Sequence, residues 1–306
     1  MRRLQWLVAF VLAVVLTACA GAADERREAR EEEGTATAGE PTVGASQPED
    51  AGTAGDEATE SGADGELTAT FSNIAETPTL DPAVAFSSDG ILFVRNIYEG
   101  LLEYAPGTTE LLPALATEWS LADDGVTYTF TLRDDVQFHD GAPFDAEAAR
   151  LGLERIREVN QGPASLMGSV AGIEAVDETT LVVTLAEPNF YFLGTLPKLP
   201  IVSPEALEAN ATDDDPQAQD WFATNAAGTG PYQLERWDRN QAITLTAFDG
   251  YWREFEDGTP TRVVLRVDPD IATAMQLLQA GEIDMMGAVG PDEAVHAESM
   301  DGVKVV

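Results

Sequence analysis

The sequence is poor in the side chains that most often ligate transition metals or act as nucleophiles. It has one cysteine, Cys19, and two histidines, His139 and His296, among 306 residues. A single cysteine cannot form an intramolecular disulfide, and this set is too small for the usual Cys/His zinc sites. A catalytic Cys/His pair would have to use Cys19 itself. We therefore expect no metal site and no cofactor.

Positive charge is also scarce. The chain has 17 Lys and Arg residues against 54 Asp and Glu residues, which gives a formal net charge of −37. Such a surface would repel a phosphate backbone rather than neutralise it, so nucleic acid is excluded as a partner. The charge favours solubility but does not specify a fold.

Motifs for nucleotide binding and for common hydrolases are missing. The sequence contains no Walker motif. Residues 168–172 resemble a Gly-x-Ser-x-Gly elbow, but Ser169 stands one place too early. Gly228-Thr229-Gly230 begins like a dinucleotide fingerprint, but Pro231 follows and has no N–H to offer a phosphate. We expect a protein that is not an enzyme and does not itself hydrolyse ATP.

The N-terminus has an apolar run too short to span a bilayer. It extends over residues 4–16, broken by Gln5, whereas about 20 apolar residues are needed for a span. Arg2 and Arg3 precede it, and Leu16-Thr17-Ala18-Cys19 follows, which resembles the cleavage and acylation site of bacterial lipoproteins. We predict a signal peptide over residues 1–18 and a lipid on Cys19. An ordinary signal peptide or a retained anchor helix is the alternative.

Apolar side chains are almost absent between Ala22 and Gly65. This stretch has no aromatic residue, Leu or Ile, and it carries 13 acidic against 3 basic residues. It cannot bury enough apolar surface to offset the entropy lost on ordering. We expect residues 19–65 to be the lipidated cysteine and a disordered acidic tether, which would hold a domain away from a membrane.

Beyond Glu66 the hydrophobic period alternates between that of strands and that of helices. Helical spacing appears from Ile91 to Leu101, and Asp145 can cap a helix that extends to Val159. A third helix, from Ile271, should stop at Gly281. Strands are predicted over residues 67–71, 126–132, 181–185 and 263–267, with a hairpin of 232–237 and 242–248. This mixture predicts an α/β or α+β protein.

Four stretches, taken together and in order, resemble bacterial extracellular solute-binding proteins of family 5, the peptide- and nickel-binding class. They are Thr79–Pro82 with Asn96–Leu101; Pro113–Ala116 with Asp124–Arg133 and Val136–Ala146; Gly228–Tyr232 with Tyr251-Trp252; and Ala280–Asp284. Each stretch also has a structural explanation. We expect His139 to be a hydrogen-bonding residue of a turn, and the glycines to allow a close backbone approach.

The resemblance implies a periplasmic-binding-protein-like fold of the class II, cluster C type, a two-lobed α/β clamshell that closes by hinge motion. The family 5 domain would cover residues 66–306, with an extra subdomain at about 104–196 in the first lobe. The ligand contacts implied here lie in two segments. They are Glu76, Thr77, Pro78, Thr79 and Leu80, then Gly228, Thr229 and Gly230.

The same resemblance implies the partners. We expect a peptide or another small solute, an ABC permease with its ATPase subunits, and a membrane reached through the lipid on Cys19. The protein would act outside the cytoplasm, as a monomer. Two other functions stay open: a tethered surface lipoprotein with an adhesive or sensory role, and a secreted hydrolase.

Family members usually extend a few hundred residues further than Val306. From that difference we expect the second lobe to be largely missing from this chain. One wall of the cleft would then be absent, and the 306-residue chain would bind peptide weakly or not at all.

Overall fold

A computed structural model describes residues 68–72, 75–268, 270–287, 289–300 and 302–305, all of which fall in one compact unit. The predicted signal peptide, Cys19 and the acidic tether lie outside the described residues. Within the described ranges, no helix combines the length and the apolar character that crossing a membrane requires.

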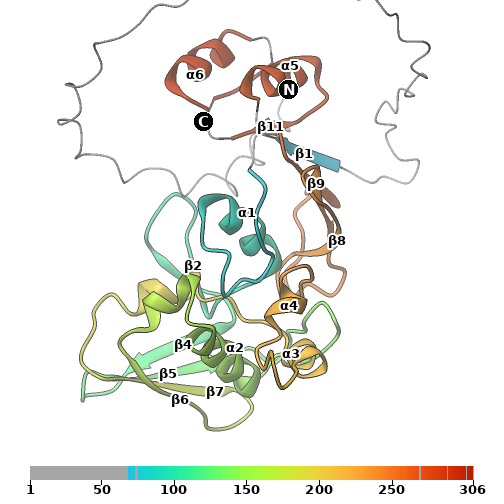
Figure 1. Ribbon diagram of the computed structural model, residues 1–306. Coiled ribbons are helices and arrows are strands. Elements are labelled where there is room, and N and C mark those ends of the chain that lie inside the picture. The colour runs from blue at the N-terminus through green and yellow to red at the C-terminus, as the bar shows by residue number, and fades with distance from the viewer. Residues whose placement is uncertain (1–67, 73–74, 269, 288, 301, 306) are drawn as a thin grey trace, which may run out of the picture. The chain divides into compact units, whose positions relative to one another are not determined.

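The first sheet contains five strands in the order β11-β1-β10-β9-β8 (Figure 1). Strand β1 lies between β11 and β10 and pairs in parallel with both, so Phe71 lies beside Leu265 on one side and Met285 on the other. Strands β8, β9 and β10 pair antiparallel. The bounds are β1 Thr68–Ser72, β8 Tyr232–Asp238, β9 Ala242–Ala247, β10 Arg262–Arg266 and β11 Met285–Met286.

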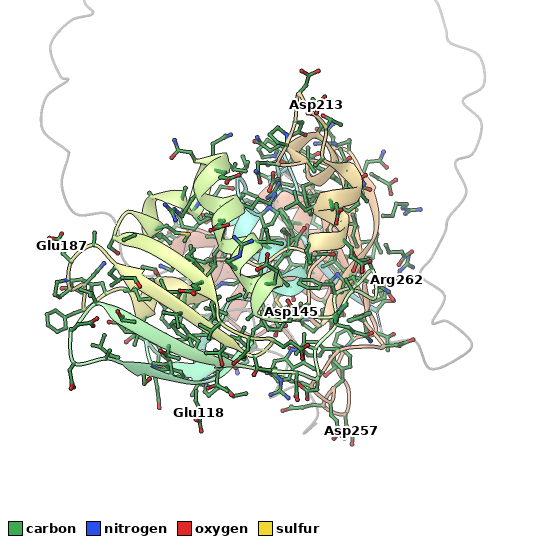
Figure 2. The ribbon with its side chains drawn as sticks, turned by 90° about the horizontal axis from the view of Figure 1, so that it is seen from below. Glu118, Asp145, Glu187, Asp213, Asp257 and Arg262 are labelled. Carbon is green, nitrogen blue, oxygen red and sulfur yellow. The ribbon has the colours of Figure 1, made fainter. Side chains whose placement is uncertain are left out.

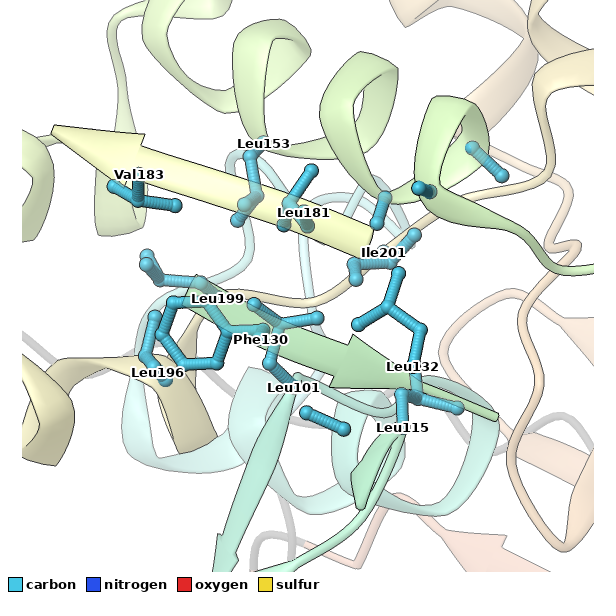
Figure 3. Packing of buried hydrophobic residues seen from close by; sticks show 14 of the residues in the cluster. Leu101, Leu115, Phe130, Leu132, Leu153, Leu181, Val183, Leu196, Leu199 and Ile201 are labelled. Atoms are coloured by element: carbon cyan, nitrogen blue, oxygen red, sulfur yellow. The ribbon is translucent and has the colours of Figure 1, made fainter. Parts of the chain in front are cut away.

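The second sheet is antiparallel, in the order β4-β5-β7-β6. Its bounds are β4 Ala116–Leu121, β5 Thr127–Leu132, β6 Val170–Ala175 and β7 Thr180–Leu185. In β5 the apolar residues Tyr128, Phe130 and Leu132 are buried, while the threonines between them face the other side. Helix α2, Ala146–Val159, packs on β6 and β7 (Figure 1). Its Leu153 points toward Leu181 and Phe130 in the core (Figure 3).

Shorter elements connect these parts. They are helix α1 Ser88–Ile97, strands β2 Leu102–Tyr104 and β3 Leu111–Pro113, the 3-10 helices η1 Gly162–Met167 and η2 Leu193–Lys198, and helices α3 Pro204–Asn210, α4 Gln219–Phe222, α5 Ile271–Ala280 and α6 Pro291–Glu298. Strands β2 and β3 form a small antiparallel pair of their own. The second sheet and α2 lie inside the 104–196 range, whose limits stay a prediction.

The predicted helix boundaries are confirmed where a cap defines them. Asp145 accepts a hydrogen bond from the Ala148 amide at 2.8 Å and starts α2. Gly281 ends α5 in the left-handed region, at φ 76°. Helix α1, however, ends at Ile97, because Tyr98 is extended at φ −124°. Tyr98 and Leu101 are also buried, although they lie in the extended segment after the helix. Their apolar side chains happen to continue the helical spacing of the sequence, which is why the predicted helix was too long.

An ion pair joins the two hydrophobic cores. Asp81, after β1, belongs to the segment that packs on the first sheet, and Arg155 lies on α2. The guanidinium donates to both carboxylate oxygens of Asp81 at 2.8 Å and to the Gln217 carbonyl at 3.0 Å. Each side chain is only 1% exposed. The pair therefore ties α2 to the loop that follows β1.

Candidate functional site

The carboxyl ends of β1 and β10 meet at one edge of the first sheet. Because β10 pairs with β9 and β9 with β8, the turn of residues 238–241 lies at this edge too, with Arg266 and Asp238 both beside Ala242. The Ser72 hydroxyl donates to Asp268 at 2.7 Å and joins the ends of the two parallel strands. In open α/β sheets, ligands bind in the crevice outside the carboxyl ends of parallel strands. We call this region the carboxyl-edge site; it comprises Ser72, Glu76–Leu80, Trp237–Gln241, Arg266 and Asp268.

Glu76 faces the turn between β8 and β9. One carboxylate oxygen accepts a hydrogen bond from the Asn240 amide at 3.1 Å. The other oxygen is buried and has no hydrogen-bond partner among the described residues. Arg239 lies 3.6 Å from that oxygen, beyond a hydrogen bond, and its guanidinium stacks on the Trp237 ring at 3.5 Å. The site thus places an acidic group, a basic group and an aromatic ring next to one another.

The rest of the first predicted segment is turned inward. Thr77 donates to the Thr79 carbonyl at 2.9 Å, and the Thr79 hydroxyl accepts from the Asp81 amide at 3.1 Å. Leu80 is fully buried, and its amide donates to the Ala223 carbonyl. Pro78 is exposed, and its carbonyl faces Arg239 at 3.5 Å. Pro78 is therefore the most exposed residue of this segment, and Glu76 is half-buried.

The second predicted segment packs against the end of α1. A Cβ atom on Gly228 would lie 2.1 Å from the Ile97 carbonyl oxygen, and one on Gly230 would lie 2.6 Å from the Asn96 oxygen. This confirms the predicted close backbone approach. His139 holds the loop, since its ring contacts the Gly228 amide at 3.3 Å and the Gly230 carbonyl at 3.0 Å, as expected of a structural histidine.

Thr229 is hydrogen-bonded to the carboxylate of Glu99, a residue that the sequence did not single out as part of a site. Its hydroxyl donates to Glu99 at 2.9 Å, and Trp252 Nε1 donates to the same oxygen at 3.0 Å. Tyr251 donates to the other oxygen at 3.1 Å. Burial raises the pKa of Glu99, and these three donors oppose part of that rise.

No hydrogen bond joins the two predicted segments within the described ranges, although Leu80 and Ala227 at their margins belong to the same hydrophobic core. Arg239 and Glu99 were missed as functional candidates. A lone arginine in a polar turn has no sequence signal. Glu99 stood in a quoted motif, but 54 acidic residues made any one carboxylate uninformative. The part of the chain that the structure describes holds no cluster of His, Cys, Asp and Glu side chains placed to bind a metal.

The fold combines a mixed α/β sheet, which has polar groups at the carboxyl edge of its parallel strands, with a separate antiparallel sheet. The chain matches cluster C periplasmic binding proteins over about half of their length. Its sequence also matches the profile "Bacterial extracellular solute-binding proteins, family 5 Middle" over residues 110–306. The chain belongs to this family, which is one of solute-binding proteins and not of enzymes.

Individual relatives agree with this assignment. The chain is 33% identical over 228 residues to a protein of Escherichia coli K12 described as "Probable D,D-dipeptide-binding periplasmic protein DdpA", covering 72% of this chain and 43% of that protein. It is 33% identical over 210 residues to the "Glutathione-binding protein GsiB" of Salmonella paratyphi A, covering 67% and 39%. The chain thus spans less than half of these curated relatives.

Solved structures show the same fold. The periplasmic binding protein DppA from Helicobacter pylori, in complex with peptide STSA, matches with a TM-score of 0.67 and 27% identity. The match covers 77% of this chain and 50% of that one. The binding protein AgaA of A. tumefacien R10, in complex with agropinic acid, matches with a TM-score of 0.66 and 26% identity, covering 76% and 46%.

Proposed function

We propose that this chain is the solute-capturing lipoprotein of an ABC importer and takes up peptides or a related small solute. The observation that carries the proposal is the carboxyl-edge site on a fold shared with binding proteins for peptides and opines. Ligands of such folds are held between two lobes, and this chain would supply the first. The protein would deliver its ligand to a permease driven by separate ATPase subunits.

The proposed ligand contacts are the two segments Glu76–Leu80 and Gly228–Gly230. In the first, the exposed Pro78 offers its carbonyl as an acceptor for an N–H group of a peptide, and the Glu76 carboxylate lies beside Arg239. The second would act mainly by shape, because Thr229 is fully buried and bonded to Glu99. Gly228 and Gly230 keep the backbone of this loop close to the end of α1, which would leave room for a ligand.

Uptake by living cells tests the transport role. Deleting the gene should abolish accumulation of a labelled tripeptide mixture, and a wild-type copy should restore it. Normal uptake of peptides, nickel–histidine and opines by the deletion strain would overturn the proposal and favour an adhesive or sensory lipoprotein.

We further propose that a lipid on Cys19 anchors the protein outside the cytoplasm. The Leu16-Thr17-Ala18-Cys19 sequence after a short apolar run supports it. Cys19→Ser should release the protein from the membrane fraction and abolish labelling by a fatty-acid analogue. Lipid label that persists in Cys19→Ser would contradict the assignment, because the chain has no other thiol to acylate.

A further inference from the structure

We propose that Arg239, stacked on Trp237, is an anion-binding subsite that receives a carboxylate of the captured solute. The inference rests on the proposed function, because it assigns part of the same ligand site. It concerns residues outside both segments predicted from the sequence, on the turn between β8 and β9 (residues 238–241).

Arg239 has no close partner in the part of the chain that is described. Its Nη1 atom lies 3.5 Å from the Pro78 carbonyl and 3.6 Å from Glu76, and both distances exceed those of good N–H···O bonds. Every other arginine ion pair in the described ranges closes to 3.1 Å or less. The Arg239 side chain is 46% exposed. In a protein with a net charge of −37, a cation that remains so loosely paired at a ligand-binding edge is available to a ligand.

The geometry presents the edge of the guanidinium to an incoming group. One face lies against the Trp237 ring at 3.5 Å, which fixes the plane of the fork. A planar guanidinium held in this way can donate two parallel N–H bonds to a carboxylate. Stacking therefore organises Arg239 for a bidentate anion before the solute arrives.

Two unsatisfied polar atoms mark the same cluster. The buried side-chain atoms without a hydrogen-bond partner among the described residues are Glu76 Oε1, Trp237 Nε1 and Tyr98 OH. Two of these three belong to the residues that touch Arg239. Of the two, only the Trp237 indole N–H is a donor that an anion could satisfy, whereas Glu76 Oε1 is an acceptor whose nearest cation is Arg239. A buried donor without a partner calls for an explanation in a native protein, and a bound anion beside Arg239 is one.

An anion fits better than a cation. Glu76 could attract an ammonium group, but its free oxygen is buried, and its other oxygen is bonded to the Asn240 amide. Arg239 is the more accessible of the two charges, since the Glu76 side chain is only 23% exposed. The nearby Asp238 and Asp268 already pair with Arg236 and Arg266 at 2.7 and 3.1 Å. An incoming carboxylate would complete the one open pair at this edge.

The test uses the full chain carrying Cys19→Ser and labelled with 5-fluorotryptophan, so that fluorine NMR reports on Trp237. Trp237→Phe assigns the resonance. The probes are trialanine and trialanine amide, which differ in the C-terminal carboxylate. We expect trialanine to shift the Trp237 signal saturably, with an affinity at least about tenfold above that of the amide, as charge-assisted hydrogen bonds allow.

Variants of exposed arginines separate the subsite from general charge. Arg239→Gln should remove the preference for the carboxylate, and Arg239→Lys should retain only part of it because lysine lacks the planar fork. Arg236→Gln, on the adjoining strand β8 and paired with Asp238, is the matched control and should behave as wild type. Circular dichroism confirms the fold of each variant.

The outcomes distinguish the two proposals. Three results would each overturn the subsite: equal binding of acid and amide by the wild type, an unchanged preference in Arg239→Gln, or no saturable shift up to about 50 mM probe, roughly fifty times a millimolar Kd. Peptide uptake in cells could still be intact in those cases, and the proposed function would stand. A carboxylate-dependent shift together with normal uptake in the deletion strain would support the subsite and refute the importer.

Discussion

Asp81 and Arg155 form an ion pair that has almost no contact with water, and each side chain is 1% exposed. The pair is bidentate, and the guanidinium also stacks on Phe222 at 4.3 Å. Burial and the nearby Asp81 charge raise the pKa of the Tyr98 hydroxyl, so this tyrosine stays neutral beside the pair. Removing one partner would leave an uncompensated charge in the interior.

We expect Arg155→Met to lower the free energy of unfolding by about 3–5 kcal/mol, because Asp81 loses its partner but stays buried. The double variant Asp81→Asn/Arg155→Met should lose clearly less than the single one, since no charge remains. Urea unfolding followed by circular dichroism measures each. Arg236→Gln, in a pair whose arginine is 62% exposed, should change stability by less than about 1 kcal/mol. A double variant that is less stable than Arg155→Met would contradict this account.

Glu99 makes stability depend on pH in the direction opposite to an exposed ion-paired carboxylate. Burial raises its pKa above the ordinary value of 4.5, so the folded state binds its proton more readily than the unfolded state. Between these two pKa values the folded protein holds more protons, and its stability falls as pH rises through that window. The hydrogen bonds from Thr229, Tyr251 and Trp252 limit this loss.

Glu99→Gln should remove that dependence. The glutamine oxygen can accept from Thr229 and Trp252, which share one carboxylate oxygen, and its amide can donate to the Tyr251 oxygen. The free energy of unfolding of the wild type should therefore fall relative to Glu99→Gln as pH rises from about 4 toward neutrality. Glu99→Ala should lose about 2–4 kcal/mol, because buried donors are left unpaired. If the free energies of unfolding of the wild type and Glu99→Gln differed by the same amount at every pH in this range, the proposed effect of Glu99 protonation on stability would be refuted.

The loop of residues 228–230 and the end of α1 form one tightly packed element pair. Gly230 donates to the Ile97 carbonyl at 2.9 Å, and the Ile97 oxygen would also lie 2.1 Å from a Cβ atom on Gly228. The His139 ring also contacts this loop, at the Gly228 amide and the Gly230 carbonyl. A side chain on Gly228 would therefore collide with the Ile97 carbonyl and with the ring of the buried Tyr98, so the backbone itself would have to shift.

We expect Gly228→Ala to lower the melting temperature strongly, with a loss of about 2–4 kcal/mol, since overpacking against a carbonyl forces the backbone to shift. Gly172 in β6 is the matched control, because nothing lies within 4 Å of its Cβ position. Gly172→Ala should stay within about 0.5 kcal/mol of the wild type. Scanning calorimetry compares the two, and similar melting temperatures would contradict the close approach.

The elements that sequence patterns predicted are those whose signals are local. The alternation in β5, the Asp145 cap and the hairpin turn of residues 238–241 depend on neighbouring residues, and the structure confirms them. The pairing of β1 with β10 has no such signal, because Thr68 and Arg262 are far apart along the chain. Arg239 became a site candidate only when that pairing brought its turn to Glu76. Thr77 and Thr79 illustrate the reverse, since their hydroxyls are used within their own loop.

Negative charge dominates the molecule as a whole. Glu118, Glu187, Asp213 and Asp257 project outward from separate parts of the surface (Figure 2). The chain has 54 acidic and 17 basic residues. Exposed ion pairs contribute roughly 0–1 kcal/mol each, so pairing cannot cancel the mutual repulsion of the excess carboxylates. Self-repulsion of this kind destabilises a compact state.

Salt should therefore stabilise the protein. The screening length falls from about 30 Å at 0.01 M to about 8 Å at 0.15 M ionic strength, which removes most repulsion between distant carboxylates while leaving short ion pairs less affected. We expect the melting temperature at neutral pH to rise by several degrees between these conditions, since about 1 kcal/mol corresponds to roughly 2–4 °C for a domain of this size. Potassium chloride should act like sodium chloride, because screening depends on ionic strength and not on the identity of the cation. A fall in melting temperature with salt, or a rise with sodium alone, would mean that specific ion pairs or a bound cation outweigh the repulsion.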